Sequence, residues 1–310
     1  MKALITGISG FVGTYLSEKL LEYNYEVIGL SRSCPTSKYI NCIPCDIQDS
    51  LKVEQVIKSC QPDEIYHLAG SGFIPLSYEK PIETYNTIVN GTLNLYEVVR
   101  KLDLDTKILY VSSAEVYGDG RGIAFNENDI LRPNNPYAGA KACADLISEQ
   151  YAKTYDMKIL RARAFNHTGP RQTSEFVCSN FAKQISEMER VGRDTIRVGN
   201  IDVKRDFLDV RDVVNAYFLI MKLGISGEVY NVSSNNGVSI HELLNTLIAI
   251  SNIKYPKIEI DDNKVREKEA SVRIGDNTKL RCHTGWLPKY DLKDTMKDLL
   301  DYWRNRKISF

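Results

Sequence analysis

The sequence predicts an α/β protein with a doubly wound parallel sheet and a smaller α/β domain in its C-terminal part. The first half alternates short apolar strands with amphipathic helices, a glycine-rich turn joins the first strand to the first helix, and the pattern becomes irregular after residue 166. Strand–helix alternation of this kind gives parallel strands that are joined by crossover helices. A chain of 310 residues is long enough for two domains.

Hydrophobic spacing predicts the individual elements. Val12, Leu16 and Leu20 recur every four positions and mark one face of a helix, whereas short apolar runs mark strands. The strands expected in the first half are 2–6, 26–30, 64–68 and 107–112, and the helices are 12–22, 50–59 and about 82–101. A strand–helix–strand pattern returns at 205–222 and 228–232. We therefore expect residues 1–166 and 203–232 to form the larger domain, and residues 167–202 and 233–310 the smaller one.

The composition excludes several classes of protein. Lys and Arg together number 40, as do Asp and Glu, so the chain lacks the basic excess of a nucleic-acid-binding protein. It has no run of 18 apolar residues and begins without a signal-like segment, so we expect no membrane association and a cytoplasmic location. Its seven cysteines are scattered, and Cys42 and Cys45 lack a second pair, so free thiols and no metal site are expected.

A glycine-rich turn, Gly7-Ile8-Ser9-Gly10-Phe11-Val12-Gly13, lies between the first strand and the first helix. Gly7 permits a sharp turn, Gly10 lets a pyrophosphate approach the backbone, and Gly13 lets the helix pack on the strand. The N-terminus of the helix also offers unpaired N–H groups to a phosphate. Glycines serve ordinary turns as well, but this position predicts a Rossmann-type dinucleotide site.

The end of the second strand bears on the choice of cofactor. It reads Leu30-Ser31-Arg32 and lacks the acidic residue that binds the ribose 2′-hydroxyl of NAD. Arg32 can instead bind a 2′-phosphate, so NADP(H) is the preferred cofactor and NAD(H) the alternative, unless Arg32 is simply a solvated loop arginine. Further cofactor contacts are expected from Asp46 and Ile47 near the adenine, and from Leu68, Ala69 and Gly70 at the end of another strand.

Three polar residues predict proton-transfer chemistry. Tyr137 and Lys141 are four residues apart and share one face of a predicted helix, and Ser113 ends a strand. A lysine ammonium is expected to lower the pKa of the tyrosine from its usual value near 10. Such a tyrosine exchanges a proton with a carbonyl or carbinol oxygen that Ser113 also holds. A Tyr–Lys pair alone is usually a surface pair, but the glycine turn and the serine favour catalysis.

Together these motifs resemble the extended short-chain dehydrogenase/reductase family over essentially the full length of the chain. The segment Arg161-Ala162-Arg163-Ala164-Phe165-Asn166-His167-Thr168-Gly169-Pro170 is similar to the GDP-mannose-related dehydratases and reductases in that family, and Thr284-Gly285-Trp286-Leu287-Pro288 resembles the family's C-terminal domain. The resemblance implies a homodimer that binds a nucleotide sugar. It places Phe165 at the cofactor and assigns Ser113, Glu115, Asn166, Val177, Arg205, Arg266 and Glu269 to the nucleotide sugar.

The resemblance leaves several activities open. It favours reduction of an NDP-4-keto-6-deoxyhexose, most of all GDP-4-dehydro-6-deoxy-D-mannose, with hydride from NAD(P)H added at C4. Glu115 occupies the position at which related dehydratases have a catalytic glutamate, so a 4,6-dehydratase or a 4-epimerase is the alternative. The short segment 31–45, where those dehydratases have an insertion, favours the reductase. A dinucleotide sensor has no need of Ser113, Tyr137 and Lys141 together.

One position departs from the family pattern. Ile88 stands three residues before Gly91-Thr92, where members of the family usually have an asparagine that orders the active site. The proton path of this chain is therefore expected to differ from that of the family.

Overall fold

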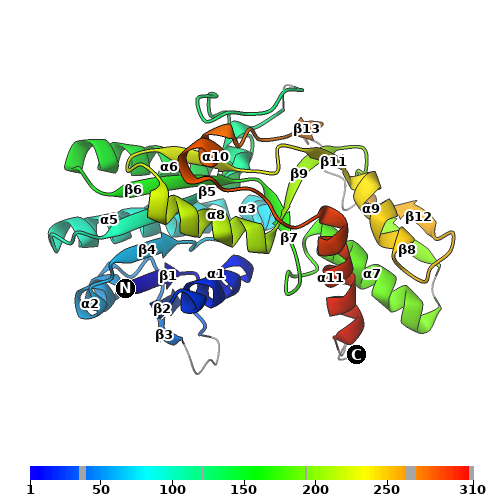
Figure 1. Cartoon of the computed structure of the whole chain (residues 1–310), viewed down its shortest axis with the longest axis horizontal. Coiled ribbons are helices and arrows are strands. Elements are labelled where there is room, and N and C mark those ends of the chain that lie inside the picture. The colour runs from blue at the N-terminus through cyan, green and yellow to red at the C-terminus, as the bar shows by residue number, and fades with distance from the viewer. Residues whose placement is uncertain (35–39, 121, 193, 263–269, 307–310) are drawn as a thin grey trace.

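The computed structural model describes residues 1–34, 40–120, 122–192, 194–262 and 270–306. Figure 1 shows a large layered part that contains the N-terminus and a smaller lobe that contains α7 (Val177–Val191), α9 (Ile240–Ala249) and α11 (Leu292–Asn305). Among the described residues, no helix is both long and apolar enough to cross a lipid bilayer.

The large part is built on a seven-stranded parallel sheet in the order β10-β6-β5-β4-β1-β2-β3. Its strands are β1 (Lys2–Thr6), β2 (Glu26–Ser31), β3 (Asn41–Pro44), β4 (Glu64–His67), β5 (Lys107–Ser113), β6 (Ile159–Ala164) and β10 (Val229–Val232). The first six strands follow the 3-2-1-4-5-6 order of dinucleotide-binding folds. The predicted doubly wound sheet is therefore confirmed.

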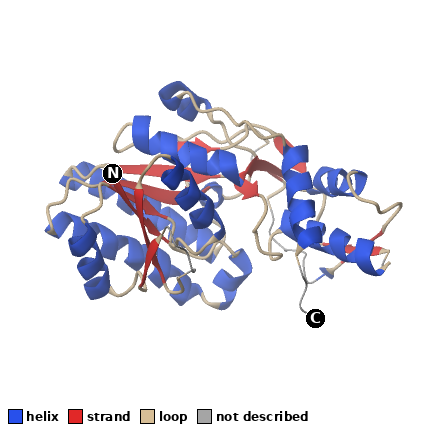
Figure 2. Ribbon diagram, turned by 60° about the horizontal axis from the view of Figure 1, so that its bottom comes forward, coloured by secondary structure: helices blue, strands red, loops and turns tan. Residues whose placement is uncertain are grey.

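Helices cover both faces of this sheet, as Figure 2 shows. Because side chains alternate along a strand, Ala3 and Ile5 of β1 enter one hydrophobic core and Leu4 enters the other. The first core contains side chains of α1 (Phe11–Glu22), α8 (Val210–Leu223) and α10 (Thr278–Thr284). The second contains side chains of α2 (Ser50–Cys60), α5 (Gly91–Lys101) and α6 (Pro136–Tyr155).

The helix that the sequence predicts at about 82–101 is divided in the structure. It consists of α4 (Pro81–Tyr85), a π-helical turn η1 (Asn86–Asn90) and α5, and it follows the short helix α3 (Ile74–Glu79). The start of α5 lies close to the loop that follows β3, since a Cβ on Gly91 would lie 2.7 Å from Cγ2 of Ile47. Glycine at this position therefore lets α5 approach the sheet edge.

The smaller lobe has its own sheet around β9 (Lys204–Asp209). Strands β11 (Gly237–Ser239) and β13 (Val272–Arg273) flank β9, which also pairs with β7 (Asn166–Thr168). The short strands β8 (Thr195–Val198) and β12 (Lys257–Ile260) pair separately, and α7, α9 and α11 enclose a third core. The chain leaves β9 directly into α8, which packs on the large sheet. The domain bounds expected from the sequence remain predictions.

The expectation of free thiols is wrong for one cysteine pair, because the structure joins Cys34 to Cys42 by a disulfide bond. Cys42 lies on β3, opposite Gly29 of β2, and Cys34 lies just beyond the end of β2. Pairing of β2 with β3 brings the two thiols together, which sequence spacing alone does not reveal. Cysteines 45, 60, 143, 178 and 282 are free.

Candidate active site

The glycine turn and the Ser–Tyr–Lys group lie at the carboxyl edge of the large sheet. Strand β1 ends at Thr6, β4 at His67 and β5 at Ser113, and all three run in the same direction. The order of strands reverses between β1 and β4, which is where α/β folds of this kind bind their ligands. The glycine turn and the Ser–Tyr–Lys group therefore open toward the same edge.

The glycine turn has the close approaches that its sequence predicts. Gly7 has a φ of +74° and donates its N–H to the oxygen of Leu30 at 2.7 Å. A Cβ on Gly13 would lie 2.6 Å from the oxygen of Gly7 and 2.7 Å from Cα of Ile8, so only glycine fits there. Gly10 caps α1 without a side-chain hydrogen bond, which leaves the first N–H groups of the helix for a ligand.

The residues predicted near the adenosine part of the cofactor lie after β2 and β3. Arg32 is exposed and directly follows β2, while Asp46 is half-buried and Ile47 is buried after β3. Oδ1 of Asp46 accepts the N–H of Gln48 at 3.0 Å, which fixes this turn. The structure therefore places all three residues along the edge that β2 and β3 form.

A buried hydrogen-bonded chain supports the turn from below. Nδ1 of His67 lies 2.7 Å from Oγ1 of Thr6, and its Nε2 lies 3.0 Å from Oγ1 of Thr92. The Thr92 hydroxyl donates to the oxygen of Ile88, so it accepts from Nε2–H of His67. The Thr6 hydroxyl accordingly donates to Nδ1 and accepts the N–H of Ala69. Burial lowers the pKa of His67 to about 3, so the imidazole is neutral.

Ser113, Tyr137 and Lys141 come together as predicted. Asn135 caps α6 by accepting the N–H of Ala138 at 2.9 Å, and this sets Tyr137 in the first turn of the helix. The side chain of Ser113 lies near the phenol of Tyr137 and acts to lower its pKa. Lys141 donates from Nζ to the oxygen of Val111 at 2.7 Å. Two neighbouring elements, β5 and α6, therefore supply the whole group.

The expected lowering of the Tyr137 pKa is not found. Burial raises the pKa of Tyr137 to about 12, against a smaller opposing effect of the nearby Ser113 side chain. Burial also lowers the pKa of Lys141 to about 8, while nearby Asp145 acts in the opposite direction. The Lys141 ammonium is engaged by the Val111 carbonyl, and desolvation dominates at both residues. At neutral pH the phenol keeps its proton and most of the lysine is charged.

Ile88 forms part of the wall beside this group. Its side chain is buried, and a Cβ on Gly70 would lie 3.1 Å from Cγ1 of Ile88 and 4.0 Å from Nζ of Lys141. Gly70 in the loop after β4, Lys141 and Ile88 are therefore neighbours. Where the family usually has an amide side chain, this chain has an apolar one that cannot relay a proton.

Glu115 has two partners that the sequence did not identify. Nη1 of Arg273 forms an ion pair with Oε1 of Glu115, and Nδ2 of Asn135 donates to Oε2 at 3.3 Å. Asn135 could have been identified from the sequence as a helix cap, because it directly precedes Pro136 at the start of a helix. Nothing in the sequence links Arg273 to Glu115, since the two residues are 158 positions apart. Only the fold brings this arginine to the site.

The predicted substrate residues lie along the junction with the smaller lobe. Asn166 opens β7 and Val177 opens α7. Phe165, which was predicted at the cofactor, is buried between β6 and β7. Arg205 is buried on β9 opposite Arg273 of β13, and its Nη1 donates to the oxygen of Lys204 at 2.9 Å. Arg266 and Glu269 lie outside the described residues, so their expected roles stay predictions.

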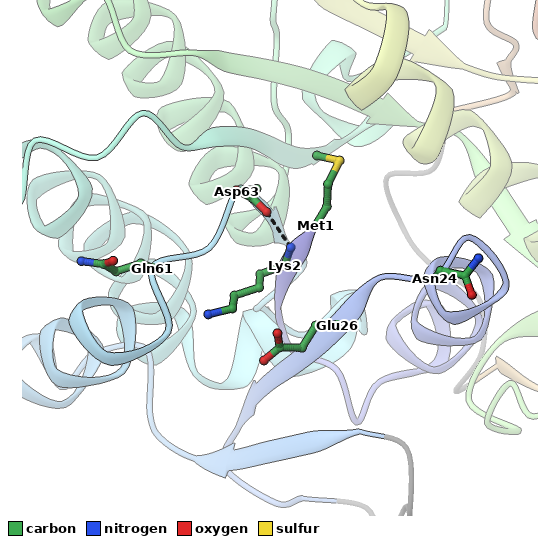
Figure 3. A pocket seen from close by; sticks show the side chains of 6 residues that line it. All are labelled: Met1, Lys2, Asn24, Glu26, Gln61 and Asp63. Atoms are coloured by element: carbon green, nitrogen blue, oxygen red, sulfur yellow. Dashed lines mark hydrogen bonds between the residues drawn. The ribbon is translucent and has the colours of Figure 1, made fainter.

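A separate pocket lies at the amino edge of the sheet, and Figure 3 shows the side chains that line it. Its lining residues come from the amino ends of β1 and β2 and from the residues before β4, and they are Met1, Lys2, Asn24, Glu26, Gln61 and Asp63. The N–H of Lys2 donates to Oδ2 of Asp63 at 2.7 Å across it. No predicted site residue lines this pocket, so it is distinct from the candidate active site.

The fold and the site define the class of protein. A parallel sheet in dinucleotide-binding order, a glycine turn after β1, and a Ser–Tyr–Lys group at the ends of β5 and α6 are the features of an extended short-chain dehydrogenase/reductase. Comparison with known proteins narrows this class. The family model for GDP-mannose 4,6-dehydratase matches residues 4–299, and the chain belongs to that family.

Individual relatives have more than one activity. A GDP-6-deoxy-D-mannose reductase from Pseudomonas aeruginosa is 33% identical over 98% of both chains. A GDP-mannose 4,6-dehydratase from Yersinia enterocolitica is 28% identical over 96% of this chain and 92% of its own. The structure of RMD from P. aeruginosa with NADPH is 31% identical, covers 98% of this chain and 99% of its own, and has a TM-score of 0.85. A UDP-glucose 4-epimerase from Thermus thermophilus with NAD is 26% identical over 98% of this chain and 99% of its own, with a TM-score of 0.89.

Proposed function

We propose that this protein is a reductase of an NDP-4-keto-6-deoxyhexose that converts GDP-4-dehydro-6-deoxy-D-mannose to GDP-D-rhamnose or a close analogue. The observation that carries the proposal is the state of Tyr137, which lies near Ser113 in the first turn of α6 and which burial keeps protonated at neutral pH. Reduction of a ketone requires such a proton donor, because the oxygen becomes an alkoxide when hydride adds to carbon. The reductase among the relatives, which matches over nearly the whole chain, supports the same activity.

The glycine turn fits a nicotinamide cofactor, with NADPH preferred and NADH possible. Close backbone approaches at Gly7 and Gly13 leave no room for side chains, and Gly10 leaves the first N–H groups of α1 uncapped. Arg32 would hold the 2′-phosphate, and Phe11, Val12, Asp46, Ile47, Leu68, Ala69, Gly70 and Phe165 would line the rest of the site. The neighbour solved with NADPH supports this preference. The cofactor supplies the hydride when it is bound.

The chain's own residues would handle the ketone oxygen and its proton. Ser113 and Tyr137 both hold this oxygen, and Tyr137 donates its proton to it as negative charge develops. Lys141, charged at neutral pH, stabilises the phenolate that remains until solvent restores the proton. Asn166, Val177 and Arg205, with Arg266 and Glu269, would bind the nucleotide diphosphate and the sugar.

The test of this function is the stoichiometry of the reaction. With GDP-4-dehydro-6-deoxy-D-mannose, the enzyme should oxidise one NADPH per sugar and release a 6-deoxyhexose nucleotide. Tyr137→Phe should lower kcat by about 10²–10⁴-fold, because it removes the general acid. Tyr255→Phe is the matched control, since Tyr255 is 97% exposed. Activity of Tyr137→Phe within threefold of the wild type would remove Tyr137 from the mechanism.

A 4,6-dehydratase is the second candidate, because Glu115 stands two residues after Ser113 and dehydratases are among the relatives. It is tested with GDP-mannose and a catalytic amount of NADP⁺. The reductase should form no ketosugar in this reaction. Accumulation of the 4-keto-6-deoxy sugar would establish the dehydratase instead.

We also propose a cytoplasmic homodimer. Large apolar side chains remain exposed on adjoining helices of the large part, with Tyr78 on α3 at 58%, Ile82 on α4 at 77% and Leu146 on α6 at 56%. An apolar patch of this kind is typical of a protein–protein interface. Light scattering after gel filtration should give twice the mass of 35.2 kDa, and Leu146→Glu should shift the protein toward the monomer. A wild-type monomer at micromolar concentration would contradict the proposal.

A further inference from the structure

Glu115 is held from two sides, although it lies next to the catalytic group. It belongs to the short helix η2 (Ala114–Tyr117), and its N–H donates to Oγ of Ser113 at 3.2 Å. Arg273 occupies one oxygen of its carboxylate and Asn135 the other. Its negative charge also raises the pKa of Tyr137, so the carboxylate and the phenol are close.

Arg273 is itself fixed in place. It is buried, with 5% of its surface exposed, and its Nε and Nη2 both donate to the oxygen of Gly118, at 3.2 and 3.1 Å. Gly118 has a φ of +73°, and a Cβ there would lie 2.0 Å from the oxygen of Arg132, so this turn is tightly packed. Strand β13 carries Arg273 and pairs with β9. The guanidinium therefore reaches Glu115 from a rigid support in the other lobe.

A site that polarises a ketone also makes the hydrogen on the adjacent carbon acidic. If a free carboxylate lies nearby, the C–H bond breaks, its electron pair forms the C=C bond of an enol, the carboxylate takes the proton, and Tyr137 protonates the oxygen. Reversal of these steps returns a solvent proton to carbon and can invert its configuration. A reductase gains from a carboxylate that is engaged elsewhere, because enolisation competes with reduction.

We infer that Arg273 is a positioning residue that holds Glu115 as a fixed anion, and that this contact keeps the site from enolising its ketone substrate. This inference rests on the proposed reductase function, and it gives the Glu115–Arg273 pair a role in reaction specificity. Arg273 acts through Glu115, to which it is bound by an ion pair. Its loss should therefore expose a new reaction and not merely weaken the existing one.

The experiment measures exchange of hydrogen at the carbons next to the ketone. GDP-4-dehydro-6-deoxy-D-mannose is incubated with enzyme in D₂O without NADPH, and deuterium uptake is followed by mass spectrometry. The wild type should exchange no faster than the enzyme-free solution, and Arg273→Met should exchange at least tenfold faster. Adding Glu115→Gln to Arg273→Met should return the rate to that of the wild type, and Arg273→Lys, which keeps the charge, should stay near it.

Two further variants control for damage to the fold. Arg281→Met removes an exposed arginine from α10 and should leave exchange at the wild-type rate. Arg273→Gln keeps a polar side chain on β13 but removes the positive charge that pairs with Glu115, so it should also raise exchange. If Arg273→Met does not fold, as judged by circular dichroism and NADPH binding, Arg273→Gln decides the question.

The outcomes separate the two proposals. Failure of the wild type to oxidise NADPH with the ketosugar would overturn the reductase function itself. If the wild type reduces the ketosugar, the inference is overturned by a folded Arg273→Met that exchanges no faster than the wild type. It is equally overturned if the exchange of Arg273→Met persists after Glu115→Gln is added.

Discussion

The buried His67 should make this protein unusually sensitive to mild acid. Its imidazole links Thr6, at the start of the glycine turn, to Thr92 of α5, and both ring nitrogens are engaged in the neutral form. A second ring proton on Nδ1 would face the hydroxyl hydrogen of Thr6. Protonation of His67 therefore breaks this chain of hydrogen bonds directly below the proposed cofactor site.

The size of the effect follows from the shift in the pKa of His67. Burial lowers that pKa from 6.5 to about 3, so between these values the unfolded chain binds one more proton than the folded protein. Stability then rises with pH across this window and falls on acidification. From pH 7 to pH 5 the free energy of unfolding should drop by about 2 kcal/mol, a loss that the unfolded pKa of about 6.5 alone determines. The full loss is reached only below pH 3.

Urea unfolding at pH 7, 6 and 5 measures this loss. His67→Gln removes the titrating group, so its free energy of unfolding should change by about 2 kcal/mol less than that of the wild type between pH 7 and pH 5. His241→Gln is the matched control, because His241 is exposed on α9, and it should follow the wild type. If the free energies of unfolding of the wild type and of His67→Gln change equally with pH, the argument that burial holds His67 neutral is refuted.

Three further predictions concern the cofactor and the site. Arg32→Ala should weaken NADPH binding tenfold or more and NADH binding little, because a charge-assisted hydrogen bond contributes about 1.5–3 kcal/mol. If fluorescence titration shows that the affinities for NADPH and NADH fall equally, Arg32 does not bind the 2′-phosphate. The value of kcat/KM for the ketosugar should fall above pH 8, because burial lowers the pKa of Lys141 to about 8 and the reaction requires its charged form. If kcat/KM stays constant up to pH 9.5, the reaction does not require a charged Lys141. Reduction of the Cys34–Cys42 disulfide should lower the free energy of unfolding by up to about 2.5 kcal/mol. The double variant Cys34→Ser/Cys42→Ser should show the same decrease, and reductant should not change its free energy of unfolding further.

Local patterns were sufficient to predict the large sheet and the placing of the Ser–Tyr–Lys group. Alternating strands and helices specify parallel pairing and right-handed crossovers, which leave few possible topologies. Tyr137 and Lys141 share a helix face because of their spacing, and Ser113 ends the neighbouring strand in the order that the crossovers impose. These features depend on residues that are close in sequence.

The sequence by itself determined the class of fold, the glycine turn and the catalytic candidates, since each depends on local spacing and backbone conformation. The tertiary structure decided the protonation states and the long-range partners. Burial reversed the expected change in the pKa of Tyr137, strand pairing joined Cys34 to Cys42, and packing of the smaller lobe brought Arg273 to Glu115. Desolvation and contacts between residues 158 positions apart arise only when the chain is folded, so no local pattern records them.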